Sequence, residues 1–132
     1  MIKNIVFDLG NVLVDFDPPR FVMEKTADKD QQKMLMSEIF GSVDWLRFDK
    51  GTMNREELLT SAKSRLPKEL HAIAEDLLDT WYIGLNAIPQ MEELPKRLKE
   101  KGLSLYILSN APQDYYLYED KVPSHSIFDG IF

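Results

Sequence analysis

Two apolar runs, far apart in the chain, each end on polar groups that can act on a phosphoryl group. The run 5–7 ends on Asp8, and the run 105–108 ends on Ser109 and Asn110. A carboxylate can attack phosphorus to form an acyl phosphate, which divides one difficult step into two easier ones. A hydroxyl and turn amides can hold the phosphoryl oxygens. Each feature alone also fits a structural role, because Asp commonly caps helices and Ser-Asn is common in turns.

The elements that must position these groups alternate between strands and helices. Residues 3–8 and 103–108 predict two buried strands, and residues 127–132 look like the approach to a third. Residues 92–101 predict a helix that begins close to Pro95 or is kinked there, because proline breaks a helix interior. The alternation indicates a parallel sheet with right-handed crossovers. The carboxyl ends of neighbouring parallel strands then open onto one crevice, where ligands bind in such sheets.

The segment between the two strands is too long and too helical to be a simple crossover. Asn54 with Glu57 is a typical helix start, and apolar residues recur at helical spacing, as in a core-facing stripe. We therefore predict an α/β protein: a partial Rossmann-like parallel sheet core, residues 1–16 and 89–132, with an inserted all-helical cap subdomain, residues 17–88.

Composition excludes several classes of protein. The 44% apolar and 29% charged residues are typical of a globular chain. A net charge of -6 argues against nucleic-acid binding, which needs clustered Lys and Arg. The absence of Cys excludes disulfides and thiolate metal sites. No apolar run approaches the ~20 residues of a membrane span, and the N-terminus lacks a signal-peptide pattern. We therefore expect a cytoplasmic protein without membrane partners.

Together, the two motifs and the helical insertion resemble the haloacid dehalogenase-like (HAD) hydrolase superfamily. The first motif of that family is a strand followed by Asp, any residue, a second Asp, any residue, and Thr or Val; here it is Asp8-Leu9-Gly10-Asn11-Val12. The second is a strand ending in Ser or Thr, often followed by Asn; here it is Leu105-Tyr106-Ile107-Leu108-Ser109-Asn110. The insertion looks like the α-helical cap of the group containing phosphatases and dehalogenases. The first motif and the loop Asp49-Lys50-Gly51 are especially similar to bacterial sugar-phosphate phosphatases.

The resemblance implies a role for five residues. Asp8 would be the nucleophile and a ligand of Mg²⁺, and the backbone carbonyl of Gly10 would be a second ligand. Ser109 and the amide of Asn110 would bind the phosphoryl group. Lys50, on the loop of the helical cap, would reach the substrate, although a solvated loop lysine is an equally ordinary interpretation.

One position departs from the family pattern. Gly10 stands where the family has its second Asp, the general acid and base, and general acid catalysis typically contributes ~10²–10⁴-fold. Asp15, Asp17 or a water could substitute, or the leaving group could need little help, as in sugar 1-phosphates. Dehalogenases also lack that Asp, usually with Tyr in its place.

The third and fourth family motifs, a Lys and an acidic pair, would lie downstream of Asn110. Neither can be located, because Lys121, Asp114, Asp120 and Asp129 stand in the wrong context. We therefore expect this chain to be the N-terminal portion of a longer hydrolase and to be inactive alone. Unpaired sheet edges would favour self-association.

The function expected from the resemblance is hydrolysis of a small phosphorylated metabolite, such as a sugar phosphate, through an aspartyl-phosphate intermediate with Mg²⁺. The alternatives are a non-catalytic relative that binds a phosphometabolite or a protein, and a haloacid dehalogenase. A nucleotide-binding Rossmann module is disfavoured, because no glycine-rich phosphate loop follows the first strand.

Overall fold

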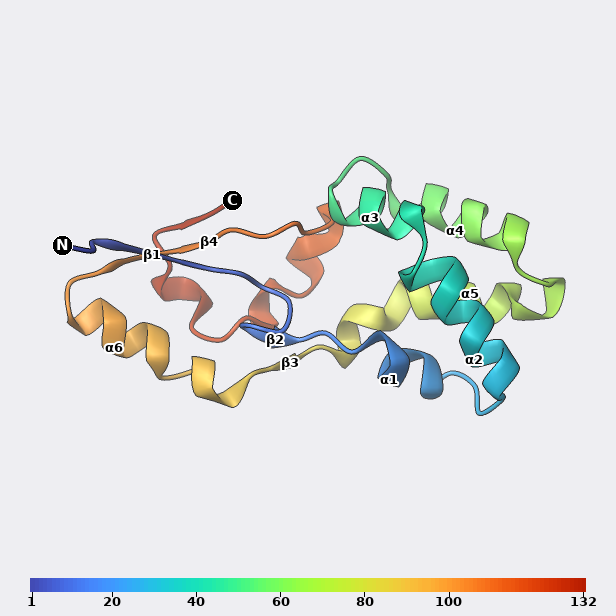
Figure 1. The fold of residues 1–132 in the computed structure, drawn as a ribbon, viewed down its shortest axis with the longest axis horizontal. Coiled ribbons are helices and arrows are strands. Elements are labelled where there is room, and N and C mark those ends of the chain that lie inside the picture. Colours follow the sequence, from blue (N-terminus) through green and yellow to red (C-terminus); the bar gives the residue numbers. More distant parts are fainter. The chain divides into compact units, whose positions relative to one another are not determined.

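The computed structural model describes all 132 residues, which form two compact units. The sheet unit comprises Met1–Phe16, Leu85–Ser109 and Tyr115–Phe132, and the helical unit comprises Asp17–Gly84 and Asn110–Asp114. Figure 1 shows the strands of the first and the consecutive helices of the second. The predicted α/β class is confirmed, with a parallel sheet and an inserted block of helices.

The sheet unit is built on three parallel strands in the order β1-β4-β5. They are β1 (Asn4–Phe7), β4 (Ser104–Ile107) and β5 (Gly130–Ile131). Helix α6 (Leu94–Glu100) precedes β4 and packs on it (Figure 1). Pro95 is the second residue of α6, so the helix begins beside the proline and needs no kink.

The two faces of the parallel sheet differ in burial. Phe7 pairs with Ile107, and both side chains are buried, with the ring of Phe128 packed edge-on 5.6 Å from that of Phe7. On the opposite face, Val6 is 57% exposed and Leu108 is 59% exposed. Parallel sheets are normally covered on both faces. Here one face forms the core of the unit, and the other carries exposed apolar side chains.

The sheet unit also contains a second, two-stranded sheet that was not predicted. Strand β2 (Val14–Asp15) pairs antiparallel with β3 (Asn86–Ala87), and the amide of Ile88 donates to the carbonyl of Leu13 at 2.9 Å. These bonds place residues 85–88 in the sheet unit, whereas the sequence assigned them to the helical segment.

The helical unit contains five α-helices: α1 (Pro18–Met23), α2 (Lys29–Leu35), α3 (Val43–Asp49), α4 (Arg55–Arg65) and α5 (His71–Thr80). A π-helical turn, Met36–Phe40, continues α2. The predicted Asn54–Glu57 capping box opens α4. Aromatic rings fill the interior, with Trp45 lying 4.6 Å from Phe40 and 5.4 Å from Trp81 between ring centroids. The apolar stripes of the sequence are therefore core.

The remaining regular structure consists of short 3₁₀ turns. They are Lys68–Leu70, Trp81–Gly84, Pro89–Met91, Gln113–Leu117, Glu119–Lys121 and His125–Ile127. None of the helices has the length and the apolar character that a membrane crossing requires.

Candidate active site

The register of β1 and β4 brings the ends of both sequence motifs to one edge of the parallel sheet. Phe7 is paired with Ile107, and the amide of Leu108 donates to the carbonyl of Phe7 at 2.9 Å. Asp8 therefore follows β1 where Leu108 and Ser109 follow β4. In open α/β sheets this edge, at the carboxyl ends of the strands, is where ligands bind.

Asp8 lies at the start of a tight turn that is held by backbone hydrogen bonds. Its Oδ1 accepts a hydrogen bond from the amide of Leu9 at 2.7 Å, and the residue is exposed. The amides of Val12, Leu13 and Val14 all converge on the carbonyl of Leu9. Because Leu9 is buried, with 4% of its surface exposed, the turn is anchored while Asp8 stays accessible.

Asn11 closes the same turn with an unusual backbone conformation. Its φ is 58°, in the left-handed region that Asn tolerates better than most residues. Its amide donates to the carbonyl of Val14 at 2.7 Å, and its Oδ1 accepts from the amide of Phe16 at 3.0 Å. The Asn in the first motif is therefore explained by turn geometry.

Two oxygen donors of the expected magnesium site lie in this turn. They are the carboxylate of Asp8 and the backbone carbonyl of Gly10, and the turn bonds go to the carbonyls of Leu9 and Val14, not to that of Gly10. Mg²⁺ is commonly held through one or two carboxylates together with waters and substrate phosphates, so this donor set fits it in kind. Nowhere in the chain are three His, Asp or Glu side chains grouped to hold a metal ion.

Ser109 and Asn110 are adjacent in sequence but belong to different units. The amide of Ser109 donates to the carbonyl of Phe132 at 3.2 Å, which extends the pairing of β4 with β5. Asn110 begins the short segment assigned to the helical unit. Within that unit, Gln113 donates from Nε2 to the carbonyl of Gly51 at 3.0 Å, which ties the segment to the loop that carries Lys50.

Asp8, Gly10 and Ser109 therefore belong to the sheet unit, and Asn110 and Lys50 belong to the helical unit. Lys50 is exposed and follows α3 directly. Beside it, burial raises the pKa of Asp49 to about 6. The roles of all five residues remain predictions.

Asp129 and Lys121, in the last part of the chain, serve other contacts. Asp129 binds the ammonium of Lys99 at the opposite end of β4 from Ser109, since its carboxylate also accepts from the amide of Leu105. Lys121 donates from Nζ to the carbonyl of Leu85 at 3.1 Å.

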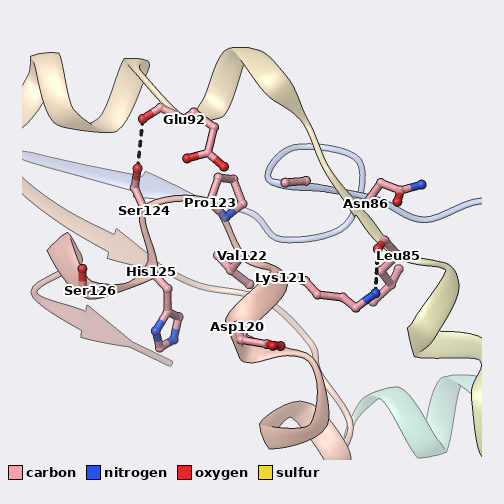
Figure 2. A pocket seen from close by; sticks show the side chains of 11 residues that line it. Leu85, Asn86, Glu92, Asp120, Lys121, Val122, Pro123, Ser124, His125 and Ser126 are labelled. Carbon is pink, nitrogen blue, oxygen red and sulfur yellow. Dashed lines mark hydrogen bonds between the residues drawn. The ribbon is translucent and has the colours of Figure 1, made fainter.

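Lys121 lines a pocket of about 590 Å³ within the sheet unit, between β3 and residues 120–126. Figure 2 shows Lys121 reaching the backbone of Leu85 and Ser124 reaching that of Glu92. His125 also lines the pocket, and its Nε2 is buried without a hydrogen-bond partner. His125 could not be singled out from the sequence, because it lies outside any helix or strand periodicity.

Solved structures share this fold. A HAD family enzyme from Bacteroides thetaiotaomicron, in complex with magnesium and inorganic phosphate, matches with a TM-score of 0.68 at 22% identity, over 100% of this chain and 68% of that one. A predicted phosphoglycolate phosphatase from Haemophilus somnus matches with a TM-score of 0.56 at 17% identity, over 99% and 62% of the two chains. A dehalogenase matches with a TM-score of 0.60 at 20% identity, over 99% and 62%.

No protein-family model matches the sequence, and no curated protein is significantly similar to it. The chain nevertheless has the fold of the HAD-like hydrolases, so the resemblance carried by the two motifs is confirmed at the level of the fold. Its solved neighbours include both a phosphatase and a dehalogenase, and the chain spans about two thirds of their length.

Proposed function

We propose that this protein hydrolyses a small phosphorylated metabolite through an aspartyl-phosphate intermediate on Asp8. The observation that carries the proposal is the placement of Asp8 and Ser109 after two paired parallel strands, in a fold shared with HAD hydrolases. An exposed carboxylate at that edge can reach a bound ligand.

In the first step, an oxygen of Asp8 bonds to phosphorus while the bond from phosphorus to the leaving oxygen breaks. In the second, water attacks the acyl phosphate, which releases inorganic phosphate and regenerates the carboxylate. The hydroxyl of Ser109 and the amide of Asn110 would hold phosphoryl oxygens, and Lys50 would contact the substrate. Asp8 and the carbonyl of Gly10 would hold Mg²⁺, which offsets the negative charge of carboxylate and phosphate.

Turnover is proposed for a protein that also carries the groups expected downstream, and not for the 132 residues alone. Two observations support this distinction. Asp8 belongs to no group of three or more His, Asp or Glu side chains that could hold a metal ion, and the chain spans 68% of the Bacteroides thetaiotaomicron enzyme. A cytoplasmic location and self-association through exposed sheet residues also remain predictions.

Asp8→Asn in the product of the native gene is the decisive test. Asn keeps an oxygen for the amide of Leu9 but is a poor nucleophile, so phosphate release should fall to background while the melting temperature stays unchanged. Retained activity would remove Asp8 from its role.

Two alternatives are distinguished by other readouts. A non-catalytic relative would bind a phosphate mimic with Mg²⁺ in calorimetry and turn nothing over. The dehalogenase alternative is favoured by the solved dehalogenase of the same fold and by Gly10, and it predicts halide release from a haloacid without added metal.

A further inference from the structure

Gly10 has open space beside it, in the turn that also carries Asp8. Leu9 between them is buried, while Asp8 and Gly10 are both exposed. A Cβ built on Gly10 would meet no atom within 4 Å. The φ of Gly10 also lies outside the left-handed region, where only Gly51 and Gly102 are found among the glycines. Neither the backbone nor the packing therefore requires glycine at this position.

The polar side chains that follow Gly10 are poor sources of a proton. Asn11 uses its Oδ1 to accept from the amide of Phe16, and an amide does not transfer a proton at neutral pH. The carboxylate of Asp17 caps α1, accepting from the amide of Arg20 at 3.4 Å, and lies 3.7 Å from the guanidinium of the same residue.

Asp15 is the remaining carboxylate of this segment. It lies in β2, paired with Asn86 of β3, and is half-buried. Its backbone is therefore held in a strand beyond the turn, five residues after Gly10. Asp8 itself acts as the nucleophile in the proposed function and cannot also protonate the leaving group in the same step.

We propose, on the basis of that function, that the site acts on phosphoryl compounds whose leaving group departs as a stable anion. Acyl phosphates and aryl phosphates belong to this class, whereas alkyl phosphates do not. As the oxygen of Asp8 bonds to phosphorus, the bond to the leaving oxygen breaks and its electron pair leaves with that oxygen. A carboxylate stays an anion at neutral pH, and a phenolate takes its proton from bulk water after it has left. An alkoxide needs a proton during bond cleavage, and general acid catalysis typically contributes ~10²–10⁴-fold to such a step.

The test compares leaving groups in the product of the native gene with Mg²⁺ present. The substrates are acetyl phosphate, 4-nitrophenyl phosphate, phenyl phosphate and glucose 6-phosphate, and kcat/KM is measured for each. The kcat/KM of the wild type should fall steeply in that order, from acetyl phosphate to glucose 6-phosphate. Gly10→Asp, which the open space accommodates, should raise the ratio of kcat/KM for glucose 6-phosphate to kcat/KM for acetyl phosphate by ~10²-fold or more. Gly10→Asn, the matched variant that carries no acid, should give no selective gain for glucose 6-phosphate over acetyl phosphate.

Three outcomes would overturn the inference. They are similar wild-type rates for glucose 6-phosphate and 4-nitrophenyl phosphate, equal effects of Gly10→Asp and Gly10→Asn, and selective loss of glucose 6-phosphate hydrolysis in Asp15→Asn. A failure of the proposed function itself would look different. None of the substrates, including acetyl phosphate, would then be hydrolysed, and mass spectrometry would detect no phosphoryl group on Asp8.

Discussion

The ammonium of Lys99 lies 2.6 Å from both carboxylate oxygens of Asp129, and so joins α6 to the residue that precedes β5. The same carboxylate accepts from the amide of Leu105, while the amide of Asp129 donates to the carbonyl of Leu105 at 2.7 Å. A helix, a central strand and an edge strand thus meet at one side chain.

Asp129→Asn should destabilise the sheet unit at neutral pH. The hydrogen bond from Lys99 and then that from the amide of Leu105 hold the pKa of Asp129 below its usual range. A lowered folded-state pKa adds stability above the unfolded-state pKa, and this stability disappears as the pH falls through the folded-state value. The urea midpoints of the variant and the wild type should differ at pH 7 and converge in strong acid.

Asp120→Asn is the matched control for that measurement, because Asp120 is exposed. Its urea midpoint should follow that of the wild type at every pH. A constant gap between Asp129→Asn and the wild type down to strong acid would show that the charge of Asp129 is not the source of the stability.

Asp49→Asn should have the opposite effect on stability. Burial raises the pKa of Asp49 to about 6, and the residue ends α3, where the helix dipole disfavours a negative charge. A raised folded-state pKa contributes stability that is fully present below the unfolded-state pKa, near 3.8. This contribution is lost as the pH rises through the folded-state pKa, about 6. The variant should therefore exceed the wild type by on the order of 1–2 kcal/mol at pH 8, after allowance for solvent screening at a partly exposed group.

Urea unfolding at pH 4 and pH 8 tests the sign of the Asp49 effect. The advantage of the variant should be present at pH 8 and nearly absent at pH 4, where the carboxyl is largely protonated. An advantage that is the same at both values would assign the effect to packing and not to charge.

Asn54→Ala should cost about 1 kcal/mol, the usual value for losing an N-cap. Asn54 accepts from the amide of Glu57 at 2.9 Å, and the Glu57 carboxylate accepts from the amide of Asn54 at 3.0 Å. Asn54→Ser retains a capping oxygen, so its free energy of unfolding should stay close to that of the wild type. Equal losses in the two variants would contradict a capping role.

Lys50→Ala tests the substrate contact proposed for the helical unit. Lys50 is an exposed loop residue, so its loss should leave the melting temperature unchanged and raise KM several-fold with little change in kcat. Lys68→Ala removes another exposed lysine of the same unit and should change neither constant. An unchanged KM in Lys50→Ala would show that Lys50 is a solvated loop residue that does not contact the substrate.

The strands that carry the site were predictable because their sequences are apolar and end on chemically distinctive residues. Asp8 and Ser109 are found at the ends of β1 and β4, as the runs before them predicted. Pro95 was also informative, because a proline near a helix start is tolerated at only a few positions.

Two features of the fold could not be predicted from the sequence. The pairing of β2 with β3 involves two residues in each strand, too few to produce an alternating pattern. The segment Asn110–Asp114 belongs to the helical unit, and its residue Gln113 bonds to the carbonyl of Gly51, a contact across sixty-two positions. Such long-range contacts depend on tertiary structure and leave no local pattern in composition.

The short β2–β3 pair has a consequence for the order in which the chain folds. β1 pairs with a strand about a hundred residues later, and closing such a loop costs on the order of 4 kcal/mol in chain entropy. The helices between them make more local contacts and can form early. Once Val14 meets Ala87, the ends of that folded insertion are held together, and only two short segments remain to be ordered before β1 reaches β4. The β2–β3 pair would then form before the transition state for folding. Substitutions in the pair should therefore slow refolding more than they speed unfolding.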